Sequence, residues 1–171
     1  YHETGDVCMV VLGIDPGYAI VGYGAIEHHG MRSRSLTYGA ITTQPGVAIE
    51  QRLLEIYRDM RTLLEKVRPD AVAIEQLFFN TNVTTGIAVA QARGVLLLAC
   101  AEGGFPVSEY TPSQVKQAVV GFGKAEKKQV MELTRSLLGL EKVPRPDDAA
   151  DALAIAICHA HTAGSRLSGG F

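Results

Sequence analysis

A carboxylate at the end of an apolar run is the feature that most constrains this sequence. The stretch VVLGIDPG, Val10 to Gly17, places Asp15 directly behind apolar residues, and Pro16 and Gly17 then interrupt the run. Short apolar runs rich in β-branched residues are typical of central strands of a sheet. The fold must therefore carry an ionisable group to the end of a buried strand.

The same pattern occurs again in AVAIEQLF, where a second buried strand runs into Glu75. At the start of the last predicted helix come Asp147, Asp148 and Asp151, and the three-residue spacing of the last two places them on one helix face. Asp147 alone is most simply a helix cap. Asp151 precedes the apolar stretch ALAIAIC, so it belongs to a buried helix, where an unpaired ionised carboxylate is costly.

Carboxylates without basic partners indicate a bound cation. A salt bridge or a turn hydrogen bond is the alternative for Asp15 and Glu75, but neither strand carries an obvious basic neighbour. Crowded acids raise one another's pKa, and a divalent cation reverses that tendency. Oxygen ligands suit Mg²⁺ or Mn²⁺ better than zinc. Two such ions in a carboxylate cluster are the usual equipment for hydrolysing a phosphodiester.

The order of the predicted elements indicates an α/β fold. We expect strands over residues 9–14, 19–27, 33–43, 71–76 and 105–110, and helices over residues 49–67, 83–102, 111–121, 125–138 and 144–161. Three strands followed by alternating helices and strands predict a mixed sheet with helices packed on it. The length of 171 residues suits one domain, residues 9–171, with residues 1–8 as an N-terminal extension or a cloning remnant.

The predicted helix over residues 83–102 is apolar on most sides. Gly86, Ala90 and Gly94 lie four residues apart, so a partner helix could approach this face closely. A buried core helix and a dimer interface fit the segment equally well. We expect no apolar run to approach the roughly 18 residues of a membrane helix, and the first residues lack the order of a signal peptide. The sequence thus predicts a soluble, cytoplasmic protein without a membrane partner.

Total charge gives no support for nucleic-acid binding. The formal net charge is −2, whereas nucleic-acid-binding proteins usually carry an excess of positive charge. The modest basic cluster, diluted by two glutamates, consists of Lys116, Lys124, Lys127, Lys128 and Arg135. A solvated helix face explains this cluster equally well.

Cysteine and histidine positions indicate structural roles. The three cysteines lie far apart, match no metal-ligand spacing and leave one unpaired in any disulfide scheme, which is typical of reduced residues. Four histidines are interpreted as surface or helix-end residues rather than ligands: His28, His29, His159 and His161.

Five separated blocks carry a resemblance to a known family. GIDPG, AIEQLFFN, QARGV, VKQAVVGFGKAEKKQV and DDAADALAIAICHAH follow in the order seen in the RuvC family of Holliday-junction resolvases. The chain resembles this family from about Met9 to His161. The resemblance implies a ribonuclease-H-like fold, with a mixed five-stranded sheet flanked by helices. It also implies a homodimer that makes paired symmetric nicks in four-way DNA junctions, in homologous recombination and DNA repair.

The resemblance further implies a site, its cofactors and its partners. The family's four acids fall on Asp15, Glu75, Asp148 and Asp151, which are the expected catalytic residues and ligands of two Mg²⁺ or Mn²⁺ ions. Asp147 is then an extra acid, a cap or an outer support of the site. Phe78 matches the aromatic that stacks on unpaired junction bases, and Lys116 and Lys127 match lysines that contact phosphates. Without the family, a core or interface phenylalanine is the better interpretation of Phe78. Partners implied are four-way junction DNA and a branch-migration complex of the RuvA and RuvB proteins.

Three other functions fit parts of the sequence. IDPGYAIVGYG resembles the phosphate-cradling turn of actin-like and sugar-kinase ATPases, but Tyr18 stands where a serine or threonine is expected and the chain is short for two lobes. A module that binds branched DNA without cutting it would gain from replacing acids that face phosphates. A ribonuclease-H-like nuclease acting on an RNA/DNA hybrid or a structured RNA is the main alternative, because its fold and metal site would be the same.

Overall fold

The computed structural model describes residues 7–77 and 83–168. The strands are β1 (Cys8–Asp15), β2 (Ile20–His29), β3 (Arg32–Thr42), β4 (Ala71–Glu75) and β5 (Val107–Tyr110). The helices are α1 (Ile49–Val67), α2 (Val83–Glu102), α3 (Pro112–Val120), α4 (Lys127–Leu137) and α5 (Asp147–Ser168).

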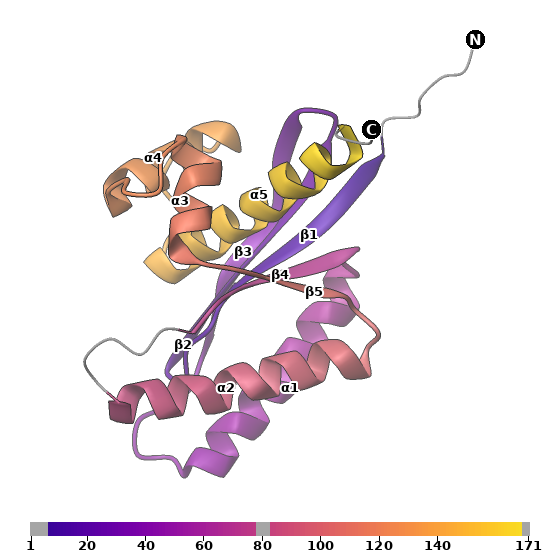
Figure 1. Ribbon diagram of the computed structural model, residues 1–171. Coiled ribbons are helices and arrows are strands. Elements are labelled where there is room, and N and C mark those ends of the chain that lie inside the picture. The colour runs from indigo at the N-terminus through magenta and orange to yellow at the C-terminus, as the bar shows by residue number, and fades with distance from the viewer. Residues whose placement is uncertain (1–6, 78–82, 169–171) are drawn as a thin grey trace.

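The strands form one sheet in the order β3-β2-β1-β4-β5. β1 pairs with β2 and β2 with β3 in antiparallel fashion, whereas β1 pairs with β4 and β4 with β5 in parallel. The predicted mixed five-stranded sheet is confirmed, and its first three strands are antiparallel. β1 lies at the centre of the sheet, so Asp15 stands at the end of a strand that is paired on both sides (Figure 1).

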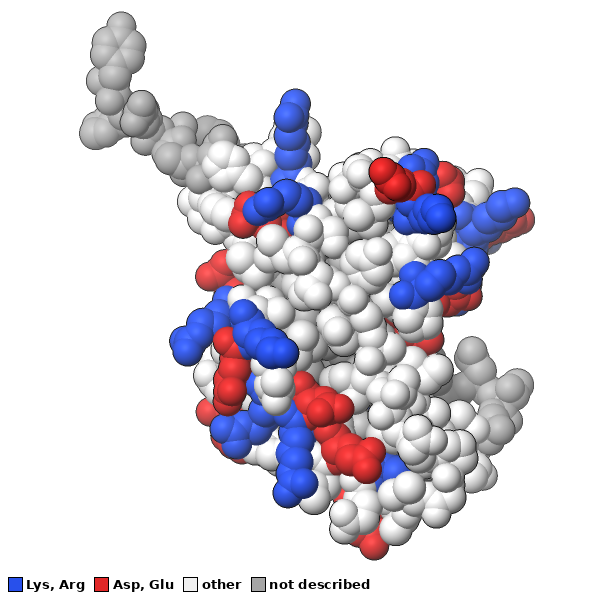
Figure 2. Space-filling view, turned by 180° about the vertical axis from the view of Figure 1, so that it is seen from behind, with Lys and Arg blue, Asp and Glu red and all other residues white. Residues whose placement is uncertain are grey.

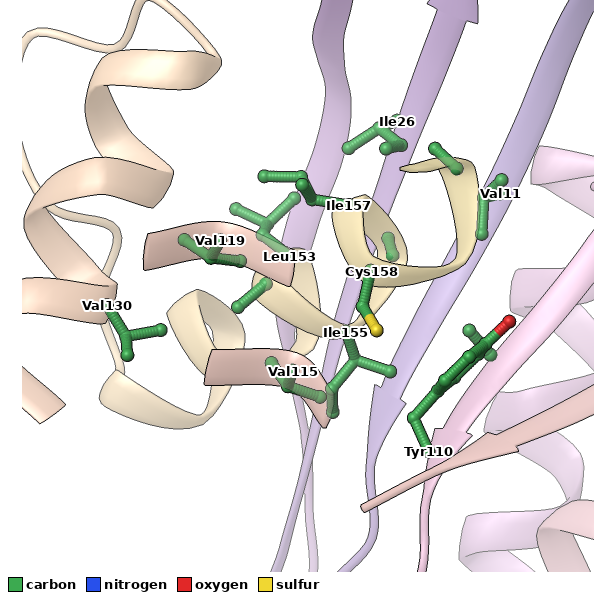
Figure 3. Packing of buried hydrophobic residues seen from close by; sticks show 14 of the residues in the cluster. Val11, Ile26, Tyr110, Val115, Val119, Val130, Leu153, Ile155, Ile157 and Cys158 are labelled. Atoms are coloured by element: carbon green, nitrogen blue, oxygen red, sulfur yellow. The ribbon is translucent and has the colours of Figure 1, made fainter. Parts of the chain in front are cut away.

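Helices cover both faces of the sheet. α1 and α2 lie on one face, and α3, α4 and α5 lie on the other (Figure 1). Side chains of β1 alternate between the two layers, since Val11 belongs to the cluster packed around α5 and Leu12 to the cluster under α1 and α2. Figure 3 shows Val11 and Ile26 on the strands next to α5, whose Ile157 lies toward Ile26 and whose Ile155 lies toward Val115 of α3. Both layers hold the central strand rigidly.

α5 is the buried helix that the sequence predicts, but its bounds differ. It begins at Asp147, after Pro144 and Pro146, because proline has no amide hydrogen and restricts the residue before it. It also continues past His161 to Ser168. Its residues from Ala152 to Cys158 are at most 1% exposed.

Capping side chains set the starts of the two short helices. Thr111 caps α3, because its hydroxyl accepts a hydrogen bond from the Gln114 amide and the Gln114 side chain accepts one from the Thr111 amide. Glu126 and Gln129 make the same reciprocal pair, so α4 begins at Lys127 rather than at Ala125. These caps place the basic residues of α3 and α4 on regular helices.

The hairpin between β2 and β3 is tighter than expected. Both strands extend through the predicted turn, which shrinks to Gly30 and Met31. His28 consequently lies in β2, is buried, and shares a hydrogen bond with the Ser33 hydroxyl. The interpretation of His28 as a surface or helix-end residue is therefore wrong, because the antiparallel ladder carries it under α5, where its ring meets that of His161.

α2 has one buried face and one exposed face. Ala92, Leu96, Ala99 and Cys100 are buried, whereas Ile87 and Leu98 are more than half exposed. A Cβ added at Gly94 would meet no atom within 4 Å, so none of the described helices packs on that glycine. Gln91 and Arg93 interrupt the apolar residues of α2, so the expectation about apolar runs stands. By length and composition alone α2 could still cross a membrane, and 22% of its apolar 18-residue window is buried.

The cysteines are unpaired, as expected. Cys100 and Cys158 are buried and Cys8 is exposed. Burial raises the pKa of the Cys100 and Cys158 thiols to about 11, so both remain protonated and act as small apolar residues.

Candidate active site

Neighbouring strands bring the first two acids to one edge of the sheet. β1 and β4 run parallel, and Ile14 pairs with Ile74, so Asp15 and Glu75 follow at the same edge. The carboxyl ends of parallel strands lie at the same end of a sheet. The backbone that carries each acid is hydrogen-bonded to neighbouring strands. The sequence predicts that two central strands each end in an acid, and the structure places these two acids next to each other.

Two glycines allow α5 to lie directly on the sheet. A Cβ added at Gly22 would stand 2.1 Å from the carbonyl oxygen of Asp148, and one at Gly13 would stand 1.9 Å from that of Ala152. Gly22 is also the register partner of Asp15 across the β1–β2 ladder. The backbone of α5 can reach the end of β1 only because these strand positions lack side chains. Sequence reasoning missed both glycines, although glycine inside a buried strand is a signal of close backbone approach.

Three of the four predicted acids form a tight group. Asp15, Asp148 and Asp151 each offer one oxygen, and these oxygens lie within 4.8 Å of one another. Glu75 stands outside this group but acts on it, because its charge raises the pKa of Asp15 and the charge of Asp151 raises that of Glu75. In the described part of the chain, residues 7–77 and 83–168, this is the one such group, and it contains no histidine.

Asp147 is directed to a different partner. Its carboxylate accepts a hydrogen bond from the guanidinium of Arg145, two residues earlier. The two acids that follow on the same helix, Asp148 and Asp151, belong to the tight group. Asp147 therefore fits the expectation of an extra acid beside the site.

Crowding and burial make ionisation of the group costly. Burial, followed by the charges of Asp151, Glu75 and Asp148, raises the pKa of Asp15 to about 8. Burial is also the largest cause of the raised pKa values of Glu75 and Asp151. A divalent cation would favour the ionised forms, and an all-oxygen donor set suits a hard ion. The residues present thus fit a magnesium or manganese site.

Two lysines from other helices approach the acids. The ammonium of Lys127 lies 3.4 Å from a carboxylate oxygen of Asp151. Burial alone would lower the pKa of Lys127, but the charges of Asp151, Asp147 and Asp15 raise it overall. Lys116 and Lys127 line a cleft of about 220 Å³ together with Glu75 and Asp151. The absence of basic neighbours inferred from the strand sequences is therefore corrected by the tertiary structure.

The structure does not place Phe78, the last of the predicted site residues. Phe78 falls within residues 78–82, outside the described residues.

Over the described residues, the face shown in Figure 2 carries no continuous basic surface, because its lysines and arginines lie among acidic side chains. This distribution agrees with the slightly negative total charge.

The fold and the acids together define a class of protein. A mixed sheet whose central strands and covering helix deliver acids to one edge is characteristic of ribonuclease-H-like nucleases that depend on metal ions. A family model described as "Crossover junction endodeoxyribonuclease RuvC" matches residues 11–159. The chain belongs to the RuvC family.

Individual relatives agree with this family. Crossover junction endodeoxyribonuclease RuvC of Clostridioides difficile is 56% identical over 154 residues, which cover 90% of this chain and 91% of the relative. The structure of T. thermophilus RuvC in complex with a Holliday junction substrate superimposes with a TM-score of 0.89 at 40% identity, covering 92% and 96% of the two chains. The yeast mitochondrial Holliday junction resolvase Ydc2 shares the fold, with a TM-score of 0.70 at 16% identity over 93% and 80%. The expected ribonuclease-H-like fold is confirmed.

Proposed function

We propose that this protein is a metal-dependent endonuclease that resolves four-way DNA junctions by paired symmetric nicks in homologous recombination and DNA repair. The observation that carries the proposal is the tight group of Asp15, Asp148 and Asp151 at the end of the central strand, within the matched region of the RuvC family. An RNA/DNA hybrid or structured RNA is not favoured as substrate, because the matching family and relatives are junction nucleases.

The four acids are proposed to hold two Mg²⁺ or Mn²⁺ ions. When bound, these ions supply Lewis-acid chemistry for in-line displacement at phosphorus. Asp15 is held by the central strand, Glu75 by its parallel neighbour, and Asp148 and Asp151 by the start of α5. Mounting ligands on three packed elements limits their movement, as a site of defined geometry requires.

Lys116 and Lys127 are proposed to contact phosphates of the junction. Both line the cleft beside Glu75 and Asp151, so a strand whose phosphate reached the acids would pass close to their ammonium groups. The Lys127 side chain is 61% exposed despite its ion pair, which leaves its charge accessible to DNA. Phe78, which follows Glu75 by three residues, is proposed to stack on unpaired bases of the junction.

A homodimer is proposed to form through the exposed face of α2. Val83, Ile87, Gly94 and Leu98 recur at spacings of four and seven residues, which places them on one side of the helix. The three large side chains among them are 53–65% exposed, and clustered exposed apolar residues are typical of interaction surfaces. A symmetric pair of subunits would supply the two sites that paired nicking requires.

The wider setting follows from the same proposal. We place the protein in the cytoplasm as a soluble nuclease of one domain, residues 9–171, that works with the RuvA and RuvB branch-migration proteins. The apolar helix α2 agrees with a protein interface rather than a membrane span, because Arg93 lies near its middle and is hydrogen-bonded within the protein.

A junction-cleavage assay tests the proposal. Purified protein is incubated with a labelled synthetic four-way junction and Mg²⁺ or Mn²⁺, with linear duplex and RNA/DNA hybrid of the same sequence as competitors. Symmetric nicks in two strands of like polarity are expected, with little loss of product when linear duplex is added. Faster cleavage of the hybrid than of the junction would contradict the assignment.

A further inference from the structure

One charged side chain links α2 to the ends of β4 and β5. Arg93 is the only charged residue of α2 apart from Glu102 at its end. Its guanidinium lies 2.5 Å from a carboxylate oxygen of Glu109 in β5, and its Nε donates a hydrogen bond of 3.4 Å to the backbone carbonyl of Glu75 in β4. The same side chain therefore contacts both strands at the edge where the acids gather.

The burial of Arg93 makes this arrangement more than a surface ion pair. Its side chain is only 15% exposed, whereas the Arg61–Glu102 pair between α1 and α2 is about half exposed on both sides. A largely buried charge that lost its partners would be costly, so Arg93 is held firmly in this position. Its contacts act as a fixed brace between the helix and the two strands.

The brace acts at the last position of β4, where the ladder to β5 ends. The last ladder position of β4 is Glu75, which pairs with Tyr110, and one further backbone bond joins Gln76 to Tyr110. The Arg93 bond to the Glu75 carbonyl adds a side-chain restraint to the peptide that carries this acid. Because the Cα–Cβ direction of Glu75 follows from its backbone, the restraint fixes the point from which the Glu75 side chain reaches the site.

Arg93 contacts the backbone of Glu75 rather than its carboxylate. Its Nε donates to the Glu75 carbonyl, and its guanidinium pairs with Glu109. Arg93 nevertheless lines a cleft of about 260 Å³ with Asp15 and Glu75, so it stands beside the site. The partners of Arg93 are the Glu109 carboxylate and the Glu75 backbone carbonyl, so Arg93 does not neutralise the carboxylates of the site.

We propose that Arg93 is a positioning residue, which orients Glu75 for metal binding by tying the end of β4 to Glu109 of β5. This inference rests on the proposed function only in taking Glu75 as a metal ligand. Residues that orient metal ligands without touching the metal contribute strongly to affinity, and their loss typically weakens binding by about 10- to 100-fold. Arg93 acts on a ligand's backbone, so the lower end of that range applies.

Manganese binding measured without DNA tests this role. Titration of metal-free protein with Mn²⁺, followed by electron paramagnetic resonance or calorimetry, is expected to show about tenfold weaker binding for Arg93→Gln. Glu109→Gln should weaken binding in the same direction, and Arg93→Lys should recover part of the loss. Arg61→Gln, which removes an exposed ion pair between α1 and α2, is the matched control and should bind Mn²⁺ like the parent protein.

Two further measurements separate this role from others. Circular dichroism and thermal unfolding check that each variant is folded, and junction binding in EDTA checks DNA contact. Parental Mn²⁺ affinity in folded Arg93→Gln and Glu109→Gln would overturn the inference, and so would lost junction binding with unchanged Mn²⁺ affinity. If the parent protein fails to nick junctions, the proposed function falls, whereas the Mn²⁺ titration still decides the role of Arg93.

Discussion

The backbone carbonyl oxygen of Asp148 packs directly against Gly22. A Cβ atom added to that glycine would lie only 2.1 Å from this oxygen. Gly22 is the β2 residue that pairs with Asp15, so this contact sets how closely the start of α5 approaches the end of β1. No side chain separates the helix backbone from the strand. The grouping of Asp15 with Asp148 and Asp151 therefore depends on a residue that carries no functional group.

Gly22→Ala should displace the start of α5. The added methyl group would meet backbone, which cannot move aside as a flexible side chain can, so we expect destabilisation of about 1–3 kcal/mol. Nicking should fall about 100-fold, because displacing a reacting group by about 1 Å has effects of this size. Urea unfolding and single-turnover nicking measure the two effects. Gly164→Ala, later in α5, has open space for its Cβ and should leave nicking unchanged.

Asp15→Asn should abolish nicking and leave junction binding largely intact. The amide keeps the shape of the carboxylate but removes a charge that a divalent ion requires. Nicking is measured with Mg²⁺ and with Mn²⁺, and binding by gel shift in EDTA. Undiminished nicking by this variant would remove Asp15 from the site.

Stability of the metal-free protein should fall as pH rises. The pKa of Asp15 is raised from 3.8 to about 8 in the folded state, so between these values the folded state binds more protons than the unfolded state. Stability from this group is present below about pH 4 and is lost by about pH 8. Thermal unfolding in EDTA at about pH 5 and about pH 9 should show the loss, and Asp15→Asn should reduce it. If the thermal stability of variant and parent depended equally on pH, Asp15 would not be the cause of the loss.

Phe78→Ala should weaken cleavage while preserving the metal site. Loss of one stacking aromatic removes about 1–3 kcal/mol of favourable contact with an unpaired base. Nicking across several junction sequences is compared with Mn²⁺ affinity in the absence of DNA. Equal cleavage by variant and parent on all junctions would remove the stacking role.

Leu98→Glu should disrupt the proposed dimer. Leu98 is 59% exposed on the outer face of α2, so a charge there is tolerated in a single subunit but opposed by burial against a partner. Sedimentation velocity is expected to show a shift from dimer to monomer, with loss of paired nicks. Leu54→Glu, at an exposed apolar position on α1, is the control and should sediment like the parent. A dimeric Leu98→Glu would place the interface elsewhere.

Local sequence patterns were enough to predict most of the helices and strands. The five strands, the five helices and the Thr111 cap follow from periodicity, β-branched runs and turn residues, which act between neighbours in the chain. The acids were also visible, because a carboxylate behind an apolar run is conspicuous in the sequence itself. Helix and strand ends were less predictable: proline moved the start of α5, capping chemistry moved the start of α4, and the antiparallel ladder lengthened β2.

The sequence by itself determined which elements form and which of them end in acids, since those properties arise from nearby residues. Only the tertiary structure decided that Gly22 admits the α5 backbone, that Lys127 pairs with Asp151, that Arg93 reaches the carbonyl of Glu75, and that His28 is buried. Most of these contacts join residues far apart in the chain, and the burial of His28 depends on a distant helix. They therefore depend on how whole helices and strands pack, which no local pattern encodes.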